Sequence, residues 1–223
     1  MAQQPDHQPL KADRAEALRL RPVSRETLVR LDQFVEILLR WQKSMNLIGS
    51  STIPQLWTRH IVDSLQLLDL APGARTWVDL GSGAGFPGVV IACALAEVPG
   101  AKVWLVDKSP KKGASLREVV RALDIPALVH TARIEDFGAA FSDSVDVVAA
   151  RALAPMGELL GFVAPFVEKG AQALLPKGQD VEVELTEAAK YWNIEATLVP
   201  SRTNPTSRIV VVSRLEAKGG PKK

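Results

Sequence analysis

One segment, residues 76–88 (TWVDLGSGAGFPG), limits the fold more than any other part of the sequence. A short apolar run breaks into three alternating glycines, Gly81, Gly83 and Gly85, and a Pro-Gly pair then leads into a second apolar run. This order predicts a strand, a tight glycine loop and a helix, in which backbone N–H groups are aimed at an anionic ligand group. Four glycines in eight residues exceed what a purely structural turn needs, so we expect a nucleotide-like cofactor here.

Two acids discriminate between the cofactors that such a loop can hold. Gly83–Gly88 fits the dinucleotide pattern G-x-G-x-x-G, which alone is weak evidence for NAD. Asp79 precedes the loop, where its carboxylate would face the negative pyrophosphate of a dinucleotide. The ammonium and sulfonium groups of S-adenosylmethionine (SAM) suit that position better. Asp107 ends the next predicted strand at a spacing suited to ribose hydroxyls, and we therefore favour SAM over NAD.

Composition limits the chain to one α/β core with a small appended segment. It has 223 residues, 47% of them hydrophobic, and a net charge of only +2, so any basic surface for nucleic acid must be local. The single cysteine, Cys93, argues against an internal disulfide and fits a reducing cytoplasm. The three histidines are far apart in the sequence, which argues against a metal site. No apolar run is long enough to span a membrane, so no membrane partner is expected.

The periodicity of apolar residues divides the chain into four parts. Residues 1–20 are expected to form a mobile arm and residues 216–223 a disordered tail. Residues 21–70 have a helical period and are expected to pack on the SAM-binding domain, residues 71–215. In that domain the predicted strands are 76–80, 102–106, 127–131, 145–150, 171–176, 194–199 and 207–213. A short loop joins the last two, which predicts an α/β fold: a Rossmann-like, doubly wound, mostly parallel seven-stranded sheet with an antiparallel C-terminal hairpin.

Several motifs in a fixed order resemble those of a known family. They are Asn46-Leu47, Arg59-His60-x-x-Asp63-Ser64, the loop from Asp79 to Gly88, Leu105-Val106-Asp107 with Lys111-Lys112, Arg151-Ala152 and Lys177-Gly178. Over about residues 28–213 the chain resembles the bacterial family called glucose-inhibited division protein B, whose members are SAM-dependent methyltransferases that act on a guanine N7 in small-subunit ribosomal RNA. One position departs from the family pattern, because this chain has Ser207-Arg208 where members often carry Arg-His.

The resemblance implies that five positions contact the cofactor: Gly81, Phe86, Ile134, Glu135 and Arg151. Ile134 would cover the adenine face, and Glu135 would accept from the exocyclic amine of the adenine. Phe86 would pack on the cofactor. Two alternatives stay open, in which Phe86 is a core side chain and Glu135 caps a short helix.

Arg151, His60 and Asp63 are expected to position the substrate without acting as a general base. Arg59, His60, Asp63 and Ser64 fall at helical i,i+4 spacings, so they would share one face that folds over the mouth of the cofactor site. An ordinary charged helix face is the alternative for these four residues. For Arg151, which is also a cofactor candidate, the alternative is a surface salt bridge.

Basic residues in and near the helix after Asp107 are expected to contact RNA, namely Lys111, Lys112 and Arg117, together with Lys177 after the fifth strand. Cations in a first helical turn oppose the helix dipole, so Lys111 and Lys112 at that place favour a phosphate partner. A solvated basic face is the alternative for the helix. A solvated turn lysine is the alternative for Lys177.

The sequence favours a reaction that needs neither a base nor a nucleophile. Residues 149–155 (AARALAP) lack the Asp/Asn-Pro-Pro-aromatic motif of exocyclic amine transfer, and Cys93 lies within an apolar helix. A ring nitrogen such as guanine N7 already offers a lone pair, so positioning would dominate catalysis. The expected partner is small-subunit ribosomal RNA, free or in the assembled subunit, and the protein is expected to be a monomer. A SAM-dependent enzyme for a small molecule and a noncatalytic RNA-binding module stay open as alternatives.

Overall fold

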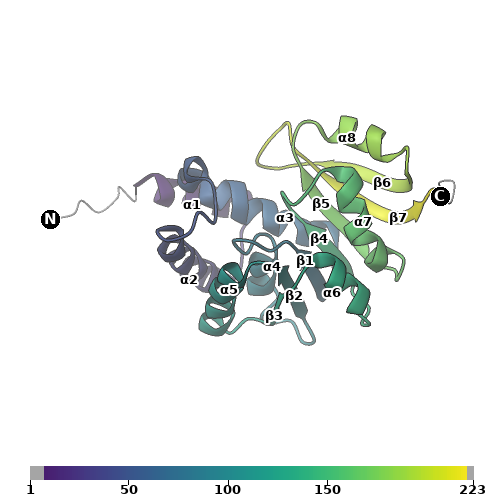
Figure 1. Ribbon diagram of the computed structural model, residues 1–223. Helices are drawn as coiled ribbons and strands as arrows, with labels where there is room; N and C mark the ends of the chain where they lie inside the picture. The colour runs from purple at the N-terminus through teal and green to yellow at the C-terminus, as the bar shows by residue number, and fades with distance from the viewer. Residues whose placement is uncertain (1–7, 220–223) are drawn as a thin grey trace.

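A computed structural model describes residues 8–219 of the chain (Figure 1). Its centre is a seven-stranded sheet with the order β3-β2-β1-β4-β5-β7-β6. The strands are β1 (Thr76–Leu80), β2 (Lys102–Asp107), β3 (Ala127–Thr131), β4 (Val147–Ala150), β5 (Gln172–Lys177), β6 (Trp192–Pro200) and β7 (Arg208–Ala217). The first five pair in parallel, and β7 pairs antiparallel with both β5 and β6. The predicted sheet and its antiparallel C-terminal hairpin are confirmed.

Helices cover the two faces of the sheet in separate groups. One face is covered by α2 (Arg25–Gln42), α3 (Asp63–Leu70), α4 (Gly88–Ala94) and α5 (Pro110–Leu123). The other is covered by α6 (Ile134–Ala140), α7 (Met156–Val167) and α8 (Val181–Ala188). Each group has its own buried cluster, because alternate residues of a strand point to opposite faces. In β1, Trp77 joins the first cluster and Val78 joins the second.

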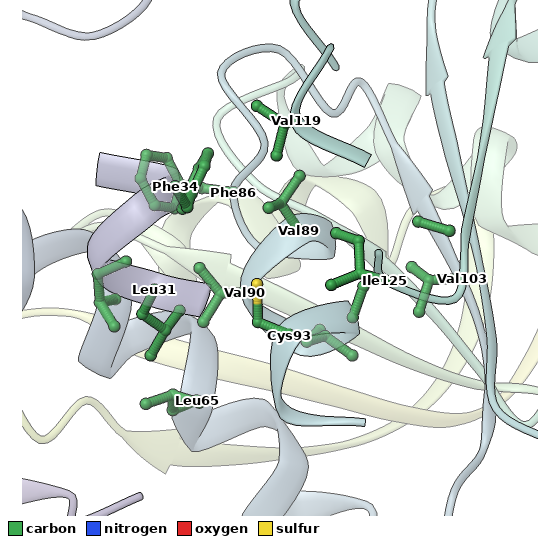
Figure 2. Close-up of a cluster of buried hydrophobic side chains, with 14 of the residues drawn as sticks. Leu31, Phe34, Leu65, Phe86, Val89, Val90, Cys93, Val103, Val119 and Ile125 are labelled. Atoms are coloured by element: carbon green, nitrogen blue, oxygen red, sulfur yellow. The ribbon is translucent and has the colours of Figure 1, made fainter. Parts of the chain in front are cut away.

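The helix that follows the glycine loop, α4, lies deep in the first cluster. Its residues from Gly88 to Cys93 are all buried. Figure 2 shows Cys93 and Val90 of α4 near Leu31 of α2, with Leu65 of α3 below them. A helix that is apolar on all sides must be covered on all sides, and α2 and α3 provide the cover that the sheet cannot. The N-terminal helices therefore share one core with the sheet.

Residues 8–20 form a helix, α1 (Gln8–Leu20), where the sequence predicts a mobile arm. The Asp13 carboxylate holds this helix in place, because its Oδ2 accepts a hydrogen bond from the backbone N–H of Trp57 at 2.6 Å. The Arg14 guanidinium lies over the Trp57 ring, 5.4 Å from the centroid. The expectation of an arm is wrong for residues 8–20. Their charged side chains suggest a solvated segment, but Asp13 and Arg14 contact Trp57 in another helix. Residues 1–7 lie outside the described residues.

The C-terminal strand is longer than predicted. Trp192 of β6 pairs with Ala217 of β7, so the first two residues of the expected tail belong to the sheet. Residues 220–223 lie outside the described part of the chain. Between residues 8 and 219, no helix is both long and apolar enough to cross a membrane.

Candidate active site

The glycine loop between β1 and α4 is held by the two acids that the sequence analysis selects. Oδ2 of Asp79 accepts a hydrogen bond from the N–H of Gly88, the first residue of α4, at 3.1 Å. Oδ2 of Asp107 accepts from the Gly83 N–H at 2.9 Å, and its Oδ1 accepts from the Ser109 N–H at 2.8 Å. Both acids lie toward the carboxyl ends of neighbouring parallel strands. The structure therefore brings Asp79, the glycines and Asp107 together.

The alternating glycines are required by the shape of this loop. Their φ angles are 73° at Gly81, 52° at Gly83 and 101° at Gly85, in the left-handed region that side chains disfavour. At Gly81 a Cβ atom would also lie 2.7 Å from Cδ1 of Leu153. At Gly85 a Cβ atom would lie 2.8 Å from Cγ2 of Val89. The loop therefore packs tightly against its surroundings.

The Asp79 carboxylate is buried and only partly satisfied. Only 1% of the residue is exposed, and Oδ1 has no hydrogen-bond partner within residues 8–219. Burial raises the pKa of this carboxyl to about 7, although the nearby Ser82 hydroxyl and the hydrogen bond from the Gly88 N–H act in the opposite direction. An unsatisfied buried acceptor is costly, and a ligand cation would relieve that cost. This oxygen therefore fits the positive groups of SAM.

Phe86 points into the core. Its ring meets that of Phe34 edge to face with centroids 5.3 Å apart, and stacks on the His60 ring at 4.9 Å (Figure 2 shows Phe86 beside Phe34). Only 7% of Phe86 is exposed. This geometry favours the alternative in which Phe86 is a core side chain that supports the loop.

Ile134 and Glu135 begin α6, directly after the loop that follows β3. β3 ends at Thr131, which is the register partner of Asp107 in β2. The two residues therefore lie near the same edge of the sheet as Asp107. Ile134 is half-buried against the second cluster, whereas Glu135 is exposed and pairs with Arg133 at 3.0 Å.

His60 lies on η2 (Trp57–Val62), a π-helical turn that follows the 3₁₀ turn η1 (Ser50–Gln55) and continues into α3. Its Nε2 lies 3.1 Å from the Thr52 hydroxyl, and its Nδ1 has no partner in the part of the chain that the structure describes. Burial, together with the charges of Arg151 and Arg59, lowers the pKa of His60 to about 3. His60 is therefore a neutral packing partner of Phe86 near neutral pH.

Arg151 connects the end of β4 with η2. Its Nη2 donates to the Arg59 carbonyl at 2.8 Å and lies 3.7 Å from Oδ2 of Asp63. Its Nη1 is buried and has no partner among the described residues. The next residue, Ala152, has a φ of 51°, a strained value for a residue other than glycine. The i,i+4 spacing predicts that Asp63 shares a helix face with Arg59. In the structure Asp63 pairs instead with Arg151, which comes from the end of β4.

A cavity of about 500 Å³ opens beside Arg151, at the carboxyl ends of β4 and β5. Its walls come from η2, β5, α8 and the loop between β6 and β7, and they include Arg59, Asp63, Arg151, Lys177, Glu184 and Thr203. Arg208, at the departure from the family pattern, also lines it and donates to the Pro205 carbonyl at 2.6 Å. A basic side chain is therefore present at that edge.

Lys177 lies in the cavity wall and is not a solvated turn lysine. Its Nζ is 2.6 Å from Oε2 of Glu184 and 3.2 Å from the Ala154 carbonyl, and only 12% of its side chain is exposed. The acidic partner balances its charge. The structure therefore separates Lys177 from the other residues expected to contact RNA.

Those other residues lie on α5, outside the cavity lining. Lys111 is exposed and Lys112 is half-buried, and neither amino group has a partner within the described range 8–219. The Arg117 guanidinium donates to the Thr131 hydroxyl at 2.7 Å. Two of the three cations are thus free to meet a ligand.

The loop between β6 and β7 is a part of the site that the sequence analysis misses. The hydroxyls of Ser201, at 3.2 Å, and Thr203 donate to Oδ1 of Asp63. Nε2 of Gln66 in α3 donates to the Pro200 carbonyl at 2.8 Å. The only signal in the sequence is a run of Ser, Thr and Asn, which is equally typical of an ordinary turn.

Comparison with known proteins identifies the family. The family model GidB, rRNA small subunit methyltransferase G, matches residues 27–208. The chain belongs to this family. It is 58% identical over 207 residues to the ribosomal RNA small subunit methyltransferase G of Bradyrhizobium sp. strain BTAi1, with 93% of each chain covered. It is also 58% identical over 210 residues to the protein of that name from Nitrobacter hamburgensis, covering 94% of this chain and 81% of the relative.

Solved structures agree on the fold. Cofactor-bound Rv0187 from MTB superposes with a TM-score of 0.61 at 13% identity, covering 95% of this chain and 99% of the other. A mutant of MtNAS in complex with S-adenosylmethionine has a TM-score of 0.54 at 16% identity, covering 84% and 75%. Family membership confirms the predicted class, SAM-dependent methyl transfer to small-subunit ribosomal RNA. None of the alternatives (NAD, a small-molecule substrate or a noncatalytic module) is supported by these relatives.

Proposed function

We propose that the protein transfers the methyl group of SAM to N7 of a guanine in small-subunit ribosomal RNA. SAM supplies a methyl group on a positively charged sulfur, and the residues of the chain bind and align the reactants. The in-plane lone pair of N7 attacks without prior loss of a proton, which suits a site where His60 is neutral and stacked on Phe86. Positioning contributes up to roughly 7–11 kcal/mol to such a reaction.

The cofactor side of this proposal rests on the two strand-end acids. Oδ1 of Asp79, which has no partner among the described residues, is assigned to the positive groups of SAM. Each oxygen of Asp107 accepts one backbone N–H and has a further lone pair for a ribose hydroxyl. Gly81 to Gly85 allow the close approach of the cofactor, and Ile134 and Glu135 are assigned to the adenine.

The position of Arg151 carries the substrate side of the proposal. It lines the cavity, and its charge also acts on Asp79 beneath the glycine loop. Its Nη2 is tied to Arg59 and Asp63, whereas its buried Nη1 has no partner within residues 8–219. O6 of guanine lies next to N7 and accepts from such a donor. A base held by O6 in the cavity would keep N7 on the cofactor side.

Lys111 and Lys112 are assigned to RNA phosphates outside the cavity. The target guanine must be unpaired or flipped out, because a paired base in A-form RNA cannot reach an enclosed site. We propose that the protein acts as a monomer.

Mass mapping of ribosomal RNA modifications from cells with and without the protein tests this function. One guanine is expected to lose a methyl mass, and its sensitivity to reductive cleavage, when the protein is absent. Purified protein and SAM should restore the methyl mass and the sensitivity to cleavage when they are added to RNA or to subunits from the deficient cells. Whichever of the two is methylated faster is the form of the substrate that the enzyme uses. Methylation at an atom other than guanine N7 would overturn the proposal.

Arg151→Lys tests the assignment of Arg151 to the base. The variant keeps the positive charge but loses the forked geometry of the guanidinium. The KM for RNA is expected to rise while the Kd for SAM stays unchanged. A weaker SAM affinity with an unchanged KM for RNA would move Arg151 to the cofactor, as the family resemblance implies.

A further inference from the structure

Guanine carries two donors, N1–H and the N2 amino group, on the edge opposite N7. Two carboxylates line the cavity and are candidates to accept from them, Asp63 and Glu184. Oδ1 of Asp63 accepts from Ser201 and Thr203, and its Oδ2 lies 3.7 Å from Nη2 of Arg151, the residue that is assigned to O6 of the base. Asp63 therefore lies on the Arg151 side of the cavity, where O6 is placed, and not on the side of the two donors.

Glu184 is engaged on one oxygen only. Its Oε2 lies 2.6 Å from Nζ of Lys177 and accepts from the N–H of Met156 at 2.7 Å. Its Oε1 has no hydrogen-bond partner in the described range 8–219. The side chain is 29% exposed, against 12% for Lys177. Lys177 and Met156 therefore fix the carboxylate while one oxygen stays free at the cavity.

The order of the strands puts Glu184 on the side that this edge of the base requires. The glycine loop follows β1, Arg151 follows β4, Lys177 ends β5, and α8 comes next in the chain. A path across the sheet from β1 to β5 therefore leads from the cofactor loop past Arg151 to Lys177 and its partner Glu184. A guanine with N7 toward the cofactor and O6 near Arg151 would direct N1–H and the N2 amino group toward Glu184.

We infer that Glu184 recognises the Watson–Crick edge of the target guanine by accepting hydrogen bonds from N1–H and the N2 amino group. This inference rests on the proposed function, because it places the base in the cavity. Adenine has a lone pair at N1, which a carboxylate repels, so the same contact rejects adenine. Lys177 acts as a positioning residue that holds the carboxylate.

Inosine tests this contact, because it lacks only the N2 amino group of guanosine. Two small-subunit RNAs are compared, one with guanine and one with inosine at the position that the modification mapping identifies. Both are used in the form, free or in the assembled subunit, that proves to be the better acceptor. The wild-type kcat/KM is expected to be at least roughly tenfold lower on inosine RNA, the loss typical of one hydrogen bond to a charged group. Glu184→Ala is expected to be slow on guanine RNA and to accept both RNAs within about twofold. Inosine changes the basicity of N7 equally for both enzymes. The difference between the two enzymes in their guanine-to-inosine ratio of kcat/KM therefore isolates the contact with Glu184.

Two further variants control for folding. Glu184→Gln retains an oxygen for the Met156 N–H but loses the charge, and it is also expected to lower the guanine-to-inosine ratio. Glu187→Gln changes an exposed acid of the same helix that pairs with Lys190, and it should leave both rates and the ratio unchanged. The Kd for SAM should match the wild type in all variants.

The outcomes separate this inference from the proposed function. A wild-type enzyme that does not distinguish the two RNAs, or Glu184 variants that keep the wild-type ratio, would overturn the role of Glu184. Failure of the wild type to methylate guanine N7 in any form of the RNA would overturn the proposed function itself.

Discussion

The imidazole of His60 lies face to face with the ring of Phe86, with centroids 4.9 Å apart and planes inclined by 22°. The stack joins η2 to the glycine loop, and burial there lowers the pKa of His60 to about 3. A histidine in this state does not change its charge near neutral pH.

Single-turnover methyl transfer at saturating SAM is therefore expected to be nearly flat between about pH 6 and 8.5, where an ordinary histidine would titrate. His60→Ala should change the rate through packing without creating or removing a pH step. A step near neutrality that disappears in His60→Ala would show general-base catalysis, and the positioning mechanism would have to be dropped.

SAM affinity, by contrast, is expected to depend on pH through Asp79. The pKa of this carboxyl is about 7 in the free protein, and a bound cation would lower it. The free protein then holds a proton that the complex lacks, so binding releases that proton and weakens as the pH falls below about 7. Calorimetry in buffers with different ionisation enthalpies measures the release. Asp79→Asn should abolish it, and a pH-independent wild-type affinity would contradict the assignment.

RNA binding is expected to lose salt dependence when Lys111 and Lys112 are replaced together by alanine. Two lost phosphate contacts should flatten the slope of log K against log salt by roughly 1.4–1.8. Lys190→Ala is the matched control, because Lys190 pairs with Glu187 at 2.6 Å and should leave the slope unchanged. SAM affinity should be the same in all three proteins. An unaltered slope in the double variant would assign both lysines to a solvated face.

The N-terminal helix is expected to contribute to stability through Asp13. Asp13→Ala leaves the Trp57 N–H without its acceptor, which should lower the free energy of unfolding by about 1–3 kcal/mol in chemical denaturation. Glu16→Ala, on the same helix, removes only an exposed pair with Arg19 and should leave the free energy of unfolding close to that of the wild type. Equal losses in the two variants would show that Asp13 is not the anchor.

Local signals account for the parts of the molecule that the sequence predicts well. Each central strand is a short apolar run, and Asp79 and Asp107 stand out because an acid at the end of such a run is unusual. The glycines between them can be assigned from their spacing alone. The sheet and the shape of the cofactor loop therefore follow from segments of a few residues each.

Long-range pairs account for what the sequence does not predict. Asp63 and Thr203 are 140 positions apart, and nothing in either segment indicates the other. Lys177 and Glu184 are only seven positions apart, but Lys177 has the sequence context of a turn lysine and Glu184 belongs to the next helix, so the fold decides this contact as well. The direction of Phe86 and the docking of α1 depend in the same way on partners from other elements. Asp63, Lys177, Glu184 and Thr203 all line the cavity, so part of its wall depends on these contacts.

The hydrogen bond from Gln66 to the Pro200 carbonyl joins residues 134 positions apart, and this separation has a consequence for biosynthesis. A ribosome completes the glycine loop, Asp107 and Arg151 before it begins β6. The growing chain thus contains every residue assigned to the cofactor while one wall of the cavity has still to be translated. A polypeptide arrested before Trp192 would carry the cofactor residues but lack the part of the cavity wall that follows β6, so it could not enclose the target base until translation is nearly complete.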